Sequence, residues 1–206
     1  MRSLWLQREG HDALIVVFGG WALGPAPFAH LQGAQDVLFM DDYRRLENSI
    51  EEIKAYYRCY LVAFSFGVAA AARWMRLHGD VFHRKVAVNG TLYPTDARRG
   101  IPAARVRATA RRLSQDNLAR FVEHCGAPPL QMPADIERLR EELLGVCAWP
   151  FDASASFETV WLSLDDRIFP PANMERAWQE SAVTPIRIQG PHAPFSRWTA
   201  WEELLA

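Results

Sequence analysis

Residues 61–71 have the sequence Leu-Val-Ala-Phe-Ser-Phe-Gly-Val-Ala-Ala-Ala, in which an apolar, strand-like segment passes through Ser65 into an alanine-rich helix. A sharp turn from strand to helix can raise a serine hydroxyl above a sheet, and small residues must flank it because the strand and the helix nearly touch. Ala63 and Gly67 meet that requirement, although the usual G-x-S-x-G pattern has glycine where Ala63 stands. The segment predicts Ser65 as a nucleophile, and an ordinary buried core segment is the alternative.

Several apolar runs around this segment are typical of strands that are buried on both faces of a parallel sheet. They predict strands at residues 13–18, 36–40, 61–64, 85–88, 157–164 and 185–188. Amphipathic or alanine-rich spacing predicts helices at residues 46–57, 66–78, 172–180 and 198–205. The alternation of the two predicts an α/β fold with a doubly wound, mostly parallel sheet.

Between residues 93 and 156 the strand pattern disappears, and the helical stretches are interrupted at Pro102, at residues 126–129 and at Pro133. We interpret this region as an inserted helical cap. A chain of 206 residues that is 50% apolar is long enough for one compact core and short for two. We therefore expect a single domain that spans residues 1–206.

The composition excludes several classes of partner and cofactor. A formal net charge of -1 gives no global reason for binding nucleic acid or a membrane. No stretch approaches the roughly 20 apolar residues that span a bilayer, and the first ten residues lack the apolar region of a signal peptide. The three cysteines, Cys59, Cys125 and Cys147, lack metal-ligand spacing and indicate reduced thiols. We expect a cytoplasmic monomer without metal or cofactor; a thiol nucleophile at Cys125 beside His124 stays an alternative.

A serine hydroxyl needs a base that takes its proton and an acid that orients this base. Asp166 follows an apolar strand end and precedes the turn Arg-Ile-Phe-Pro, and Asp165 is the alternative acid. His192 follows a strand end and a glycine turn. Each candidate directly follows an apolar run, which places Ser65, Asp166 and His192 together at the carboxyl edge of a parallel sheet. The sequence therefore predicts a Ser-His-Asp triad.

The loop Phe-Gly-Gly-Trp-Ala-Leu-Gly at residues 18–24 follows the first predicted strand. Acyl transfer places negative charge on the carbonyl oxygen, and backbone N–H groups can stabilise it. We assign these donors to Phe66, directly after the nucleophile, and to Trp21, after the two glycines. The glycine pair also fits an ordinary turn, whereas a nucleotide site is disfavoured because both common phosphate-loop motifs are missing.

Four motifs together carry a family resemblance: residues 18–24, Val-Ala-Phe-Ser-Phe-Gly-Val at 62–68, Val-Asn-Gly-Thr-Leu-Tyr-Pro at 88–94 and Gly-Ile-Pro at 100–102. The chain resembles the BioG-type pimeloyl-acyl carrier protein methyl ester esterases over nearly its whole length. This resemblance implies an α/β-hydrolase fold, with the family's Ser, Asp and His at Ser65, Asp166 and His192. It also implies hydrolysis of pimeloyl-acyl carrier protein methyl ester to pimeloyl-acyl carrier protein and methanol in biotin precursor synthesis.

A cluster of arginines lies in the cap, and no acid stands among them. Acyl carrier proteins are acidic, so a local cationic surface can steer and pair with such a partner. A solvated basic helix is the alternative, and nucleic acid is disfavoured because aromatic residues are not interleaved with the cluster. The predicted docking residues are Arg98, Arg99, Arg105, Arg107, Arg111 and Arg112.

Two other functions stay open. The same triad can act on another ester or a thioester, because the fold does not determine the substrate. A catalytically silent, hydrolase-like binding module is the alternative from another class. The residues predicted to line the acyl pocket are Trp21, Phe66, Tyr93 and Phe121.

Overall fold

The computed structural model describes residues 1–130, 133–151 and 153–206. The described residues contain a seven-stranded sheet with the order β1-β3-β2-β4-β5-β6-β7. Within this described part of the chain, only the pair of β1 and β3 is antiparallel. The strands are β1 (Arg2–Gln7), β2 (Ala13–Phe18), β3 (Asp36–Asp41), β4 (Arg58–Phe64), β5 (Arg84–Val88), β6 (Thr159–Ser163) and β7 (Ile186–Ile188). The predicted α/β class with a mostly parallel sheet is confirmed.

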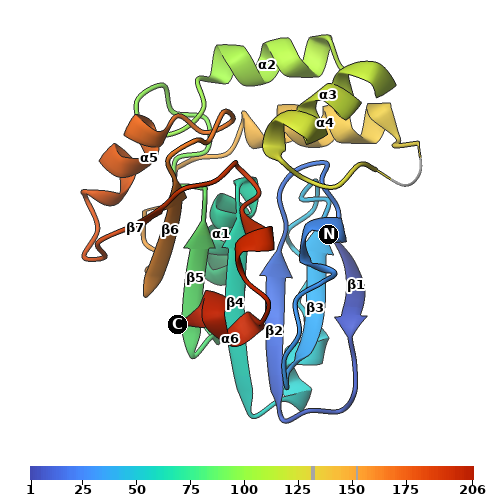
Figure 1. Cartoon of the computed structure of the whole chain (residues 1–206), viewed down its shortest axis with the longest axis vertical. Coiled ribbons are helices and arrows are strands. Elements are labelled where there is room, and N and C mark those ends of the chain that lie inside the picture. Colours follow the sequence, from blue (N-terminus) through green and yellow to red (C-terminus); the bar gives the residue numbers. More distant parts are fainter. Residues whose placement is uncertain (131–132, 152) are drawn as a thin grey trace.

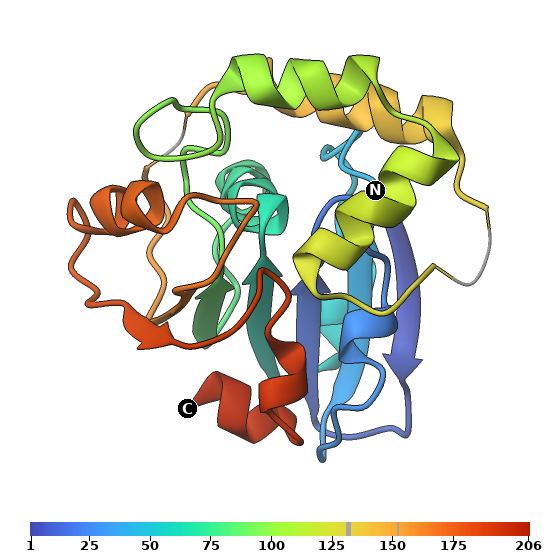
Figure 2. The same ribbon diagram turned by 45° about the horizontal axis from the view of Figure 1, so that its top comes forward.

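Three helices follow β5 and lie across the carboxyl ends of the parallel strands (Figure 1, Figure 2). Helix α1 lies behind the sheet and α6 lies in front of it in Figure 1. The helices are α1 (Phe66–His78), α2 (Ala103–Arg111), α3 (Gln115–Cys125), α4 (Ile136–Val146), α5 (Pro171–Trp178) and α6 (Trp201–Leu205). Helices α2, α3 and α4 therefore cover the edge at which the predicted triad residues emerge.

The core sits around the central strands. Val16 of β2 lies opposite Leu38 of β3 and Leu61 of β4, and the side chains of all three are fully buried. Other parts of the chain cover both faces of these central strands, so the side chains that point to either face are buried. This burial explains why the strands have a continuous apolar sequence rather than an alternating one. No described helix combines the length and the apolar character that a membrane crossing requires.

Three local predictions were wrong. Strand β1 was missed because it is an edge strand with polar residues and half-exposed side chains, so it has no continuous apolar run. The helix predicted at 46–57 is only a 3-10 turn at Glu51–Ala55. The Asn48 carbonyl there accepts a hydrogen bond from the Trp74 indole at 3.1 Å instead of from a helical N–H. The helix predicted at 198–205 begins at Trp201, after a 3-10 turn at Phe195–Arg197.

Candidate active site

Ser65 stands at the turn between β4 and α1. Its backbone has φ 58° and ψ -126°, a region that residues with a side chain seldom occupy. Its N–H donates to the Val88 carbonyl at 2.9 Å, which ties the turn to β5. A Cβ atom at Gly67 would lie 2.2 Å from the Phe18 carbonyl oxygen, and one at Gly90 would lie 2.2 Å from the Ser65 carbonyl oxygen. Both positions therefore require glycine so that β2 and β5 can approach the turn.

Two of the predicted triad residues, Ser65 and Asp166, each lie within hydrogen-bonding distance of the third, His192. His192 Nε2 is 2.9 Å from Ser65 Oγ, and His192 Nδ1 is 2.7 Å from Asp166 Oδ2. Because a carboxylate only accepts, Nδ1 carries the proton toward Asp166, and Nε2 is free to accept the Ser65 hydroxyl proton. The side chains of His192 and Asp166 are 1% and 0% exposed. Water is thus kept from the imidazole and from the carboxylate that orients it.

The second oxygen of Asp166 is also held in place. Asp166 Oδ1 accepts hydrogen bonds from the N–H groups of Ile168 at 2.7 Å and Phe169 at 2.9 Å. The Phe169 ring lies nearly parallel to the His192 ring, with 6.0 Å between centroids. Asp165 instead accepts from the Gly190 N–H at 3.3 Å. The geometry therefore pairs His192 with Asp166 rather than with Asp165.

Asn89 joins the loops that carry Asp166 and His192, a role that we did not predict. Its Nδ2 donates to Ser163 Oγ at 2.7 Å and to the His192 carbonyl at 2.7 Å, while its Oδ1 accepts from the Ser163 N–H at 2.7 Å. The side chain is fully buried at the end of β5. The Asn-Gly-Thr motif could have indicated this role of Asn89, because a polar side chain at a buried strand end requires hydrogen-bond partners.

The loop Gly19–Gly20–Trp21 passes beside the nucleophile. A Cβ atom at Gly20 would lie 3.2 Å from Ser65 Cβ, so the backbone runs close to the serine. The Gly19 N–H donates to the Met40 carbonyl at 2.9 Å, and the Trp21 indole donates to the Leu139 carbonyl of α4 at 2.9 Å. The assignment of the Trp21 and Phe66 N–H groups as oxyanion donors stays a prediction.

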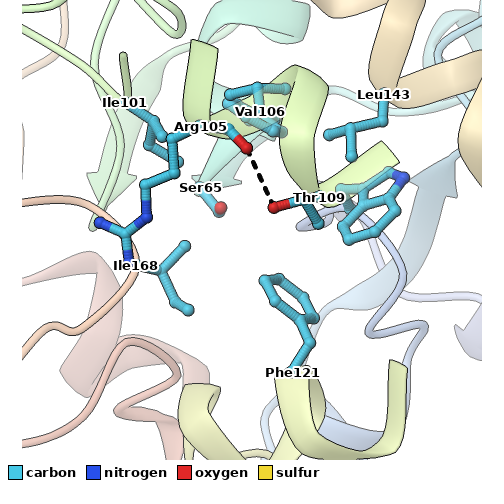
Figure 3. A pocket seen from close by; sticks show the side chains of 10 residues that line it. Ser65, Ile101, Arg105, Val106, Thr109, Phe121, Leu143 and Ile168 are labelled. Carbon is cyan, nitrogen blue, oxygen red and sulfur yellow. Dashed lines mark hydrogen bonds between the residues drawn. The ribbon is translucent and has the colours of Figure 1, made fainter. Parts of the chain in front are cut away.

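A pocket of about 500 Å³, including its open mouth, lies above Ser65. Figure 3 shows the Ser65 hydroxyl facing into it, beneath residues of α2 and opposite Phe121 of α3. Three of the four aromatic residues predicted to line the pocket do so, together with polar Arg105 and Thr109. Tyr93 packs elsewhere, where its hydroxyl donates to Glu180 at 3.2 Å. The lining residues are Trp21, Ser65, Phe66, Ile101, Arg105, Val106, Thr109, Phe121, Leu143 and Ile168.

The six predicted docking arginines lie in different settings. Arg105 and Arg112 line a groove that continues from the Ser65 pocket and also contains Arg120 and Arg167. Arg107 and Arg111 are exposed on α2, where the helical repeat turns them to another side from Arg105. Arg98 lies in the loop before α2, and Arg99 already pairs with Glu180 at 3.0 Å and with Asp96 at 3.5 Å.

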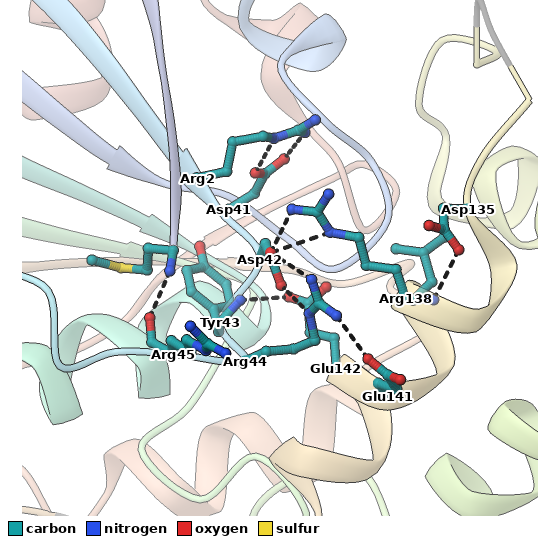
Figure 4. A network of polar contacts seen from close by, with 12 residues as sticks. Arg2, Asp41, Asp42, Tyr43, Arg44, Arg45, Asp135, Arg138, Glu141 and Glu142 are labelled. Carbon is teal, nitrogen blue, oxygen red and sulfur yellow. Dashed lines mark hydrogen bonds and ion pairs between the residues drawn. The ribbon is translucent and has the colours of Figure 1, made fainter.

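Helix α4 is joined to the loop after β3 by a polar network (Figure 4). Asp42 accepts from Arg138 at 2.6 Å and from Arg44 at 2.7 Å. Burial alone would raise the pKa of Asp42, but these two hydrogen-bonded arginines outweigh it and lower the pKa to about 2. Glu142 Oε1 accepts from the Tyr43 N–H at 3.1 Å. Burial raises the pKa of Glu142 to about 7, and the hydrogen bond from Tyr43 only partly opposes it.

Cys125, the alternative thiol nucleophile, is fully buried at the end of α3. Burial raises the pKa of this thiol far above its ordinary value, and the nearby Asp166 adds to the effect. A thiol in this environment stays protonated, so its setting is that of a core side chain.

Comparisons with known proteins agree with this geometry. Residues 1–133 match the model of a family described as pimeloyl-ACP methyl esterase BioG. The crystal structure of BioG from Haemophilus influenzae superimposes with a TM-score of 0.88 at 28% identity and covers all of both chains. A putative aryl esterase from Burkholderia cenocepacia gives a TM-score of 0.67 at 15% identity over 94% of this chain and 87% of the other. These matches confirm the predicted α/β-hydrolase fold.

Two sequence relatives differ in length. An uncharacterized protein from Haemophilus influenzae is 31% identical over 217 residues, which cover 99% of both chains. A malonyl-[acyl-carrier protein] O-methyltransferase from Bacteroides fragilis (strain 638R) is 31% identical over 191 residues. That match covers 86% of this chain, and the chain spans only 39% of the length of the methyltransferase.

Proposed function

Because the chain belongs to the BioG family of pimeloyl-ACP methyl esterases, we propose that it hydrolyses the methyl ester of pimeloyl-acyl carrier protein and releases methanol. The observation that supports this proposal most directly is the chain of hydrogen bonds from Asp166 through His192 to Ser65. A hydroxyl that faces a buried, correctly oriented imidazole can be activated as a nucleophile.

In the proposed mechanism, Ser65 Oγ attacks the ester carbonyl while its proton passes to His192 Nε2. Asp166 holds the imidazole and stabilises its cationic form. The N–H groups of Phe66 and Trp21 stabilise the negative oxygen of the tetrahedral intermediate. His192 then returns the proton to the departing methoxy oxygen, and methanol leaves an acyl-enzyme on Ser65. A water molecule then gives a proton to His192 and attacks the acyl carbonyl, and the bond to Ser65 Oγ breaks as His192 returns that proton to Ser65 Oγ. The free carboxylate is released.

The pocket supports an extended acyl chain as the substrate. Most of its lining is apolar, and Trp21, Phe66 and Phe121 approach Ser65 from the first loop, the start of α1 and helix α3. Apolar walls gain free energy from each methylene group that leaves water, at about 0.8 kcal/mol per buried CH₂. We propose these three aromatic residues as the contacts of the pimeloyl chain.

The cationic surface supports a carrier-linked substrate. Arg105 stands in the lining of the Ser65 pocket and, with Arg112, in the adjoining groove, so positive charge borders the path by which a tethered chain would enter. Acidic partners are steered and oriented by such a surface. We propose that Arg105 and Arg112, which lie next to the acyl pocket, contact the carrier protein, and that the other cap arginines add to the positive field that attracts it.

The methyltransferase from Bacteroides fragilis provides a further argument. Its name describes transfer of a methyl group to malonyl on acyl carrier protein, and part of that protein is 31% identical to this chain. A methyl ester that is formed on a carrier-linked acid must later be removed to recover the acid. We infer that this chain performs the complementary hydrolysis on a carrier-linked chain.

The proposal is tested by the hydrolysis of methyl pimeloyl-acyl carrier protein beside free monomethyl pimelate. We expect rapid cleavage of the carrier-linked methyl ester and none of free monomethyl pimelate, and loss of the activity in Ser65→Ala. Cleavage of free esters with none on the carrier would assign the triad to another ester or a thioester. Absence of both turnover and fluorophosphonate labelling at Ser65 would indicate a binding module.

A separate experiment tests the docking surface. We expect Arg112→Glu to raise the KM for the carrier-linked ester at least tenfold, because it places a carboxylate against an acidic partner. Arg58→Glu is the matched control, since Arg58 is exposed at the start of β4 and Ser65 follows the other end of that strand. Equal KM values for the two variants would contradict docking at this groove.

A further inference from the structure

Helix α4 contacts the loop Gly19–Gly20–Trp21 and the residue that supports it. The Leu139 carbonyl accepts from the Trp21 indole at 2.9 Å, and Glu142 Oε1 accepts from the Tyr43 N–H at 3.1 Å. Residues three apart lie on the same face of a helix, so one face of α4 makes both contacts. The cap is therefore hydrogen-bonded to the rim of the active site at two neighbouring points.

Tyr43, which is hydrogen-bonded to Glu142 through its N–H, also forms a hydrogen bond with Gly19 through its hydroxyl. Its hydroxyl donates to the Gly19 carbonyl at 2.7 Å and is 3.1 Å from the Met40 carbonyl. The Gly19 N–H donates to the same Met40 carbonyl at 2.9 Å. Burial raises the pKa of Tyr43 well above its ordinary value, so the phenol keeps the proton that it donates. The tyrosine ring is stacked on Phe18 with 5.9 Å between centroids, which leaves it little freedom to turn.

From these contacts we propose that Tyr43 and Glu142 are positioning residues, which hold the loop Gly19–Gly20–Trp21 where it stabilises the oxyanion. The Gly19 carbonyl and the Gly20 N–H belong to one planar peptide unit, so fixing the carbonyl also fixes the start of the loop beside Ser65. Two successive glycines are otherwise the most flexible residues that a loop can contain. Neither Tyr43 nor Glu142 needs to contact the substrate.

The inference rests on the proposed esterase chemistry, in which oxyanion donors must lie within about 2.7–3.1 Å of the charged oxygen. A displacement of about 1 Å in a catalytic group can cost on the order of 100-fold in rate. Loss of the Tyr43 hydroxyl should therefore lower kcat while substrate binding in the apolar pocket is retained.

The test uses Tyr43→Phe in the full chain, with the small ester p-nitrophenyl acetate as substrate. We expect kcat to fall about tenfold, which corresponds to a loss of about 1.4 kcal/mol of transition-state stabilisation, and KM to change less than twofold. A trifluoromethyl ketone, which forms a charged tetrahedral adduct with the serine, should bind about tenfold more weakly. A matching ether, which forms no adduct with the serine, should bind to Tyr43→Phe as tightly as it binds to the wild type.

Glu142 provides a second set of variants. Glu142→Ala should reproduce the fall in kcat, and Glu142→Gln should restore it because the amide oxygen can still accept from the Tyr43 N–H. Glu141→Gln is the control: Glu141 is the neighbouring exposed carboxylate and pairs with Arg44 instead. If Glu142→Ala does not fold, Tyr43→Phe alone provides the test.

Unchanged kcat and unchanged affinity for the trifluoromethyl ketone in folded Tyr43→Phe would overturn the inference, as would a rise in KM alone. Failure of the wild-type protein to cleave the carrier-linked ester would refute the proposed substrate and would leave this test intact. The two failures are distinguishable because p-nitrophenyl acetate requires no carrier protein.

Discussion

Replacement of Glu142 by glutamine should change how the stability of the protein depends on pH. Burial raises the pKa of Glu142 from an ordinary value of 4.5 to about 7. Between these values the folded protein binds more protons than the unfolded chain, so its free energy of unfolding must fall as pH rises. The stabilising contribution of the neutral carboxyl is complete below about pH 4.5 and is lost as pH rises through about 7.

The magnitude follows from the difference between the two pKa values. Each pKa unit corresponds to about 1.4 kcal/mol, so complete ionisation costs about 3 kcal/mol. Between pH 5 and pH 8 this cost grows by about 2.5 kcal/mol. Glutamine has the same shape and does not ionise, so any difference in its own hydrogen bonds is independent of pH. From pH 5 to pH 8 we therefore expect the free energy of unfolding of Glu142→Gln to rise by about 2.5 kcal/mol relative to that of the wild type.

Urea unfolding followed by tryptophan fluorescence at pH 5, 6, 7 and 8 measures this difference, provided that the slopes with urea are equal. The matched control is Glu141→Gln, since Glu141 is one residue away and exposed. Exposed ion pairs contribute about 0–1 kcal/mol, so the control should follow the wild type at every pH. Parallel curves for the wild type and Glu142→Gln would refute the reasoning, because they would show that folding does not raise the pKa of Glu142.

Three further substitutions test the support of the triad. Asn89→Ala leaves the Ser163 N–H and the His192 carbonyl without their hydrogen-bond partner, so it should lower the free energy of unfolding in urea by about 2–4 kcal/mol and lower kcat. A wild-type free energy of unfolding and kcat would contradict this role. Gly90→Ala places a Cβ atom 2.2 Å from the Ser65 carbonyl oxygen and should abolish turnover. Gly145→Ala is the control and should keep turnover, because a Cβ atom at Gly145 would meet no neighbouring atom within 4 Å. Asp166→Asn should lower kcat by about 10⁴-fold, whereas Asp165→Asn should not; the reverse result would exchange their roles.

Most strands of the sheet and the candidate residues at its edge were predictable because they depend on local sequence patterns. Strands buried on both faces require continuous apolar runs, which appear at β2, β3 and β4. Candidate polar residues follow the ends of such runs, so their common edge could be inferred before their contacts were known. Tyr93 was less predictable, since an aromatic residue near a site can pack in several directions.

Other parts depended on contacts between residues far apart in the chain. Asn89 is 74 positions from Ser163 and 103 from His192, and Glu142 is 99 positions from Tyr43. No periodic pattern relates such pairs. The arginines of the cap also could not be separated by sequence, because only the packed structure shows that Arg105 and Arg112 line one groove while Arg99 pairs with Glu180.

The amino-acid sequence by itself determined the parallel sheet, the serine turn and the loops that carry the candidate acids and the candidate base, because burial and turn geometry restrict which residues can occupy each position. Only the tertiary structure decided that Asp166 rather than Asp165 pairs with His192, and that Glu142 is buried. Adjacent aspartates have nearly the same sequence context, and the pKa of a carboxyl depends on the solvent and charges that surround it after folding.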